Sequence, residues 1–159
     1  MRKVLVLSIF FSSLLFAKEG DPGGWGKAKW GMTESQVAKA FGGTIPTETD
    51  IGSFKYSVRF LYDANGKLER VMLKASEDSS VSVCYEDVTT RLKAKYGKPE
   101  TEDSNLDNIK NQKGNAVWSF KKSKILVKMA HNIFGGDTIK FMYITYQKAG
   151  IVEKGSNNL

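Results

Sequence analysis

The side chains that could perform nucleophilic or acid–base chemistry are few in this sequence and far apart. His131 is the single histidine and Cys84 the single cysteine among the 159 residues. Ser119 and Lys122 have the S-x-x-K spacing of serine acyl-transfer enzymes, but they fall at a strand-to-turn junction rather than at a helix start. A Ser-His-Asp set would depend on His131, and no G-x-S-x-G motif occurs to position its serine. We interpret His131 as an ordinary strand-end histidine and expect no catalytic residues.

Metal and cofactor motifs are also missing from the sequence. Zinc sites use three or four His, Cys or carboxylate ligands at characteristic spacings, and one histidine with one distant cysteine forms no such cluster. The segment Asp63–Lys67, "DANGK", begins like a calcium loop, but its glycine comes too early and the distal glutamate is missing. The "GGWG" of Gly23–Gly26 lacks the third glycine and the preceding strand of a dinucleotide-binding loop. We therefore expect no metal and no cofactor.

Binding is the remaining class of function, and aromatic side chains in loops are its first candidates. We expect Trp25, Phe134 and an outward-pointing Tyr146 to be exposed, since loop aromatics make good contact anchors for a protein partner. The turn "KKSK" adds three basic candidates: Lys121, Lys122 and Lys124. These lysines could make weak contact with an acidic surface or with anionic lipid headgroups, although a solvated hairpin turn is the simpler interpretation.

The N-terminal 17 residues have the layout of a secretory signal peptide. Arg2 and Lys3 precede the uncharged apolar run Val4–Phe16, and the small residue Ala17 ends it. The run has 13 residues, fewer than the roughly 20 that a helix needs to span a bilayer. An uncleaved anchor is the alternative. We expect cleavage near Ala17 to leave a soluble chain without a transmembrane segment, in a periplasm or outside the cell.

Charge and cysteine content limit the partners and the covalent structure of the mature chain. Removing Arg2 and Lys3 lowers the net charge from +7 to +5, which is too weak and dispersed a basic bias to indicate nucleic-acid binding. One cysteine cannot form an internal disulfide. Cys84 lies on an apolar stripe of helical spacing, which indicates a buried thiol; a bridge between two copies is the alternative.

The first half of the mature chain predicts a short helix and a β-hairpin. Thr33 is a good N-cap, Gln36 can close a capping box, and Gly42 and Gly43 end the helix. The hairpin follows from the period-two alternation of two segments around the turn Asp63–Lys67. The two segments are Phe54–Tyr62 and Leu68–Ala75.

The second half predicts one long helix and three strands. The helix covers Ser80–Tyr96 and is ended by Gly97 and Pro99. The polar segment Glu100–Asn115 is typical of a long exposed loop. The apolar segments "AVWSF", "ILVKMAH" and "TIKFMYITY" then predict three strands.

This order of elements predicts a single α+β domain over residues 30–148. A flexible lead-in at 18–29 precedes it, and a polar tail at 149–159 follows it. The halves 30–75 and 80–148 each consist of a helix that ends in an aromatic–glycine pair and is followed by a meander. We therefore predict two helix-then-antiparallel-meander units, with the helices on one face of an antiparallel sheet. One continuous sheet or two smaller sheets would both satisfy the pattern.

The segment "GMTESQVAKAFGG" resembles the opening of the BamE/SmpA-like outer-membrane assembly lipoproteins. The helix-then-meander repeat also resembles the β-lactamase inhibitory protein, which is built from two such units. The layout is similar to that of many small exported bacterial proteins of unknown role. The chain departs from the assembly lipoproteins because it has no cysteine directly after the predicted cleavage site, where such proteins carry their lipid.

These observations predict an exported, soluble, non-enzymatic binding module that engages a protein partner. The resemblances imply either an inhibitor-like or an envelope-associated role. The alternative is a small hydrolase or a ligand carrier with a pocket against the sheet. A deep pocket in which His131 meets a carboxylate and a hydroxyl would favour the hydrolase.

Overall fold

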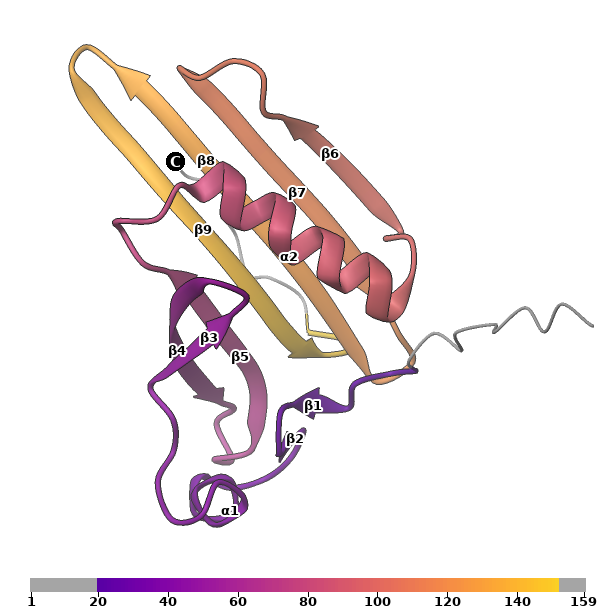
Figure 1. The fold of residues 1–159 in the computed structure, drawn as a ribbon. Helices are drawn as coiled ribbons and strands as arrows, with labels where there is room; N and C mark the ends of the chain where they lie inside the picture. The colour runs from indigo at the N-terminus through magenta and orange to yellow at the C-terminus, as the bar shows by residue number, and fades with distance from the viewer. Residues whose placement is uncertain (1–19, 152–159) are drawn as a thin grey trace, which may run out of the picture.

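The computed structural model describes residues 20–151, and it is built on one seven-stranded antiparallel sheet (Figure 1). The predicted signal peptide at 1–17 and the last eight residues of the predicted tail lie outside this range. In spatial order the strands are β3 (Glu48–Ile51), β4 (Phe54–Tyr62), β5 (Leu68–Ala75), β9 (Asp137–Lys148), β8 (Ser123–Phe134), β7 (Asn111–Ser119) and β6 (Thr101–Asn105). The remaining elements are the small hairpin β1 (Gly24–Trp25) and β2 (Ala28–Lys29), and the helices α1 (Glu34–Ala40) and α2 (Val81–Tyr96).

The predicted arrangement of two helix-then-meander units is wrong. The last strand, β9, pairs with β5, so the strands of both halves join in one sheet. In this pairing Leu73 lies opposite Ile144 and Val71 opposite Tyr146. The reason is that a meander ending at β5 would leave one row of backbone N–H and C=O groups unpaired, and β9 satisfies them. The two helices are also unequal, since α1 has seven residues and α2 has sixteen.

The predicted helix after Thr33 is confirmed, including its capping box. The backbone N–H of Gln36 donates to Thr33 Oγ1 at 3.3 Å, and the backbone N–H of Thr33 donates to Gln36 Oε1 at 2.9 Å. The helix ends at Ala40 with Phe41 as its C-cap, after which Gly42 adopts a positive φ of 86° that favours glycine. These local bonds explain why so short a helix begins and ends where it does.

The β4–β5 hairpin and the long helix are also confirmed. In the hairpin turn, Asp63 Oδ1 accepts from the backbone N–H groups of Asn65 and Lys67, both at 2.9 Å. The helix α2 runs to Tyr96 and is ended by Gly97, which has a φ of 85°. Strong local sequence signals predicted both elements, and both are present in the structure.

The expectation of a long loop at Glu100–Asn115 is wrong, because this segment contains β6 and the start of β7. All five residues of β6 are exposed, as an edge strand allows, so its sequence shows no apolar alternation. At the start of β7 the inward positions are Gln112 and Gly114, which are not apolar either. Apolar alternation is therefore missing where the strand is exposed to water, as in β6, and where a neighbouring side chain fills the space, as at Gly114.

The helix α2 covers one face of the sheet, chiefly over β7, β8 and β9 (Figure 1). Tyr85 of α2 lies so close to Gly114 that a Cβ on this glycine would be 2.7 Å from the ring. Trp118 Nε1 donates to the carbonyl of Gly97 at 2.8 Å and fixes the end of the helix to β7. Cys84 faces the sheet and is 0 % exposed, so it is a buried free thiol.

Residues 24–29, in the segment expected to be a flexible lead-in, form the β1–β2 hairpin, which lies on the sheet beside α1. Trp25 contacts the rings of Phe41 and Phe60, with centroid distances of 6.1 Å and 5.8 Å. Gly24 is required in this hairpin because a Cβ there would lie 1.9 Å from the carbonyl oxygen of Ala28. Trp25 is therefore docked on the domain, beside the part of the covered face that α2 does not reach.

Candidate functional site

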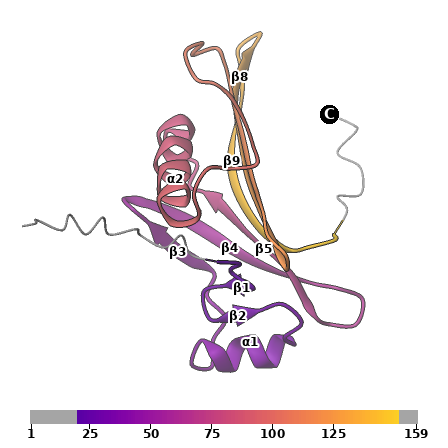
Figure 2. The same ribbon diagram turned by 90° about the vertical axis from the view of Figure 1, so that its right-hand side faces the viewer.

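The second face of the sheet, which we call the open face, has no described helix against it (Figure 2). At the C-terminal end of β9 this face is crossed by the chain that follows the strand. There, Gln147 Nε2 donates to the carbonyl of Ile151 at 3.4 Å. Beyond this point the side chains of β4, β5, β8 and β9 on this face alternate with those that form the core. A sheet face of this kind is available to a ligand or a partner.

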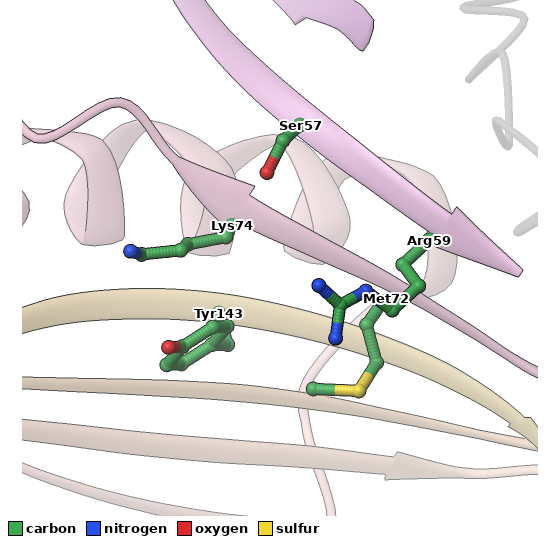
Figure 3. Close-up of a pocket in the computed structure, with 5 residues that line it drawn as sticks. All are labelled: Ser57, Arg59, Met72, Lys74 and Tyr143. Carbon is green, nitrogen blue, oxygen red and sulfur yellow. The ribbon is translucent and has the colours of Figure 1, made fainter. Parts of the chain in front are cut away.

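Five side chains on this face line a hollow of about 290 Å³, which we call the open-face hollow (Figure 3). They come from three neighbouring strands: Ser57, Arg59, Met72, Lys74 and Tyr143. The register explains their proximity, because Ser57 lies opposite Lys74 and Lys74 lies opposite Tyr143. Arg59 lies opposite Met72, and Figure 3 shows its side chain extending from β4 toward the Met72 side chain. The hollow thus combines cations, a thioether and a phenol ring.

The charge on Lys74 is fixed by an acidic neighbour. Its Nζ donates to Glu77 Oε1 at 3.0 Å. This hydrogen bond and the charge of Glu77 raise the pKa of Lys74, and the same contact lowers the pKa of Glu77. A lysine that acts as a general base needs a lowered pKa instead. Lys74 is therefore a protonated amine beside Ser57, and the two do not form an activated nucleophile.

An apolar stripe leads from the open-face hollow to the tip of the β8–β9 hairpin. Tyr143 contacts Phe141, with ring centroids 5.5 Å apart. Further along are Ile139, which is 55 % exposed, and Phe134, which is 63 % exposed. The strand pairing puts these side chains on the open face, since Phe141 lies opposite Ala130 and Phe134 opposite Asp137. We call Phe134, Ile139, Phe141 and Tyr143 the open-face stripe.

The tip of the hairpin gathers further exposed apolar side chains. Ile133 is 41 % exposed, and Ile109, in the neighbouring β6–β7 turn, is 69 % exposed. A hydrogen bond of 3.0 Å from the backbone N–H of Ile133 to the carbonyl of Lys110 joins the two segments. Ile133 alternates with Phe134 along β8 and so lies on the opposite face of the hairpin from the open-face stripe. The stripe places several apolar side chains on one face, which is typical of an interaction surface.

The aromatic residues expected from the sequence to be exposed lie in different surroundings. Phe134 belongs to the open-face stripe, as described above. Trp25 is half-buried in the ring cluster beside α1. The expected outward orientation of Tyr146 is wrong: it is half-buried, lies opposite Ile125 and Val71, and packs against the core. Burial raises the pKa of Tyr146, with a smaller contribution from Tyr96.

The three candidate lysines are divided between two places. Lys121 and Lys122 lie in the β7–β8 turn, where they line a second hollow, around Trp30. Lys124 lies one strand position after Ser123, opposite Gln147, on the open face. The β7–β8 turn is at the start of β8 and the apolar tip at its end, so the two features lie at opposite ends of the sheet (Figure 1).

His131 lies within β8 on the face that α2 covers, and it lines neither of the two hollows. Its Nδ1 is 3.3 Å from Gln112 Oε1. Over residues 20–151 no group of three or more His, Cys, Asp or Glu side chains is placed to hold a metal ion. No helix in that same range is long and apolar enough to cross a bilayer.

The residues of the open-face hollow were not singled out from the sequence. Alternation in the segment Phe54–Tyr62 does indicate that Ser57 and Arg59 point away from the core. However, Tyr143 joins them through the β5–β9 pairing, for which the sequence has no local signal. Comparison with known proteins finds no family model that matches the chain and no curated protein with significant similarity to it.

Proposed function

We propose that this chain is an exported, non-enzymatic binding module that engages a protein partner through the open face of its sheet. The observation that carries the proposal is the open-face hollow with the open-face stripe beside it, on a face that no described helix covers. The hollow would receive an anchoring side chain of the partner. The stripe would supply the apolar contact area around that anchor.

The residue types on this face support a protein partner. Arginine, tyrosine and methionine are enriched in protein interfaces, and arginine and tyrosine often contribute most of the binding energy. Arg59 makes no salt bridge with another residue in 20–151, so its guanidinium can pair with a carboxylate of the partner. We therefore expect the partner to present an acidic side chain next to an apolar surface.

The size of the hollow favours a partner side chain over a free ligand. Pockets for small molecules enclose about 300–1,000 Å³ and bury most of the ligand. At about 290 Å³ the open-face hollow is at the lower limit of that range, and it lies on the sheet surface. The protonated state of Lys74 argues against the hydrolase alternative, because a Ser57–Lys74 pair would need a neutral amine.

Site-specific photo-crosslinking tests where the partner binds. A benzoylphenylalanine at position 143 replaces one ring by another on the open face, and the same residue at exposed Glu86, on the outer side of α2, is the matched control. The two mature chains are incubated with the exported fraction of the producing cell and irradiated. We expect one partner adduct from position 143, and we expect Arg59→Glu in the same chain to abolish it.

Two outcomes would contradict the proposal. An equal yield of the same adduct from position 86 would place the partner elsewhere, and an adduct that is insensitive to Arg59→Glu would exclude the hollow as its anchor. Thermal unfolding of each variant confirms that it is folded.

N-terminal sequencing of the exported chain tests the export component, with Lys18 as the expected first residue.

A further inference from the structure

The second hollow lies at the end of the sheet remote from the apolar tip. It is an open surface depression with a volume of about 750 Å³. Four lysines from three distant segments line it: Lys29, Lys121, Lys122 and Lys148. Trp30 also lines it, together with Asp21 and Pro22. We call this site the lysine hollow.

A network of hydrogen bonds around Ser123 holds the wall of the lysine hollow in place. Ser123 is 1 % exposed, and its Oγ donates to Asp21 Oδ1 at 2.6 Å. The same oxygen accepts from Trp30 Nε1 at 2.8 Å. The carboxylate of Asp21 also accepts from the backbone N–H groups of Gly23 and Lys122. These hydrogen bonds join segments about a hundred positions apart and hold together the backbone segments that carry the lysines.

Among residues 20–151, the lining of the lysine hollow carries more positive than negative charge. Over the described residues no salt bridge involves any of its four lysines. Lys29 Nζ makes one long contact of 3.4 Å, to the carbonyl of Pro22. Asp21 is the single acidic group in the lining, and its carboxylate is already occupied by Ser123 and two backbone groups. Burial alone would raise the pKa of Asp21, but these hydrogen bonds and the nearby charge of Lys122 outweigh burial and lower it.

We propose that the lysine hollow binds a phosphate group carried on an organic body. Lysine ammonium groups bind phosphate as compact point charges, and several of them can surround its oxygens. Trp30 would contact the body that carries the phosphate, because it lines the hollow and its indole N–H is occupied by Ser123. This site is distinct from the open face and goes beyond the proposed partner binding.

The phosphate could be that of a free metabolite or of a lipid headgroup, and the test has one arm for each source. The soluble arm uses inorganic phosphate and glycerol 3-phosphate, with glycerol as the uncharged comparison, measured by calorimetry and tryptophan fluorescence. The vesicle arm measures co-sedimentation with phosphatidylglycerol vesicles and, as the neutral comparison, phosphatidylcholine vesicles. Binding in either arm should weaken as salt is added, since exposed charges are screened.

Two charge-matched double variants separate the site from general charge attraction. Lys121→Gln with Lys122→Gln removes two charges at the lysine hollow, and Lys67→Gln with Lys110→Gln removes two exposed charges elsewhere. We expect the first pair to weaken binding about tenfold, the combined effect of two exposed ion pairs. We expect the second pair to leave the affinity unchanged, and both variants to keep the thermal stability of the parent chain.

Binding to inorganic phosphate or glycerol 3-phosphate assigns the site to a free phosphate compound. Binding only to phosphatidylglycerol vesicles assigns it to a lipid headgroup. Equal weakening by the two double variants would reduce the effect to net charge and overturn the proposal. The absence of binding to every phosphate probe would overturn it as well. Neither result depends on the open face, so the two proposals can fail separately.

Discussion

The two faces of the sheet are formed by the same strands but have opposite chemistry. On β5, Val71 and Leu73 are 0 % exposed and belong to the core. Met72 and Lys74 alternate with them and line the open-face hollow instead. The strand β9 repeats this division. Stability and binding therefore depend on adjacent positions of one strand, and substitutions one residue apart should separate the two properties.

The largest expected effect comes from the pair Leu73→Ala and Met72→Ala. Leu73→Ala leaves a cavity in the covered face and should lower the free energy of unfolding by about 2–5 kcal/mol. Met72→Ala removes a half-buried side chain and should cost less than about 1 kcal/mol. Urea unfolding of residues 18–159, followed by circular dichroism, measures both values. Equal losses would show that the open face is as much a part of the core as the covered face.

The next effect tests how closely α2 approaches the sheet. Gly114→Ala places a Cβ 2.7 Å from the Tyr85 ring, so the helix or the ring must shift. Overpacking of this kind costs about 1–3 kcal/mol. Gly20→Ala is the matched control, since a Cβ at Gly20 has no atom within 4 Å and should change nothing. A neutral Gly114→Ala in the same unfolding measurement would mean that the contact between α2 and β7 is loose.

The two helices should also differ in what stabilises them. The short helix α1 depends on its capping box, whereas α2 has no side-chain cap bond at Ser80 and is held by packing on the covered face. Thr33→Ala should therefore cost about 0.5–2 kcal/mol. Ser80→Ala should cost less, and the comparison of thermal midpoints shows the difference. A larger loss from Ser80→Ala would reverse this assignment.

The last prediction concerns pH and the covered face. Burial raises the pKa of Tyr85 from 10.0 to about 12, with further contributions from Glu102 and Asp103. The folded state thus holds this proton more tightly than the unfolded state does. The resulting stability is fully present below pH 10 and is lost as the pH rises toward 12. Burial also raises the pKa of Tyr56 and Tyr146, so absorbance titration should show several late phenol transitions. Tyr85→Phe should remove one of them, and an unchanged titration curve in that variant would contradict the assignment.

The elements with local signals could be predicted from the sequence, and those without them could not. Thr33 and Gln36 define the start of α1, and the alternation around Asp63 defines the β4–β5 hairpin. The strand β6 has no such signal because all its side chains are exposed. At the start of β7, Gly114 takes the place of an apolar residue because Tyr85 occupies the space of its side chain.

The candidate sites depend even more on tertiary structure. Lys121 and Lys122 were recognisable as basic turn residues, but Lys29 and Lys148 join them through the pairing of distant segments. The orientation of Tyr146 could not be predicted either, and it packs inward rather than on the outer surface. Its strand is apolar on both faces, so alternation alone does not indicate which face is buried.

The central position of β9 determines when the chain can complete its fold. The two halves of the sheet meet through this strand, which ends at Lys148 and is the last of the strands in residues 20–151 to be synthesised. Until residues 137–148 have left the ribosome, neither β5 nor β8 has its partner on that side. Pairings between such distant segments form slowly. A leader of the kind expected at residues 1–17 would therefore act on a nascent chain whose sheet has not yet closed.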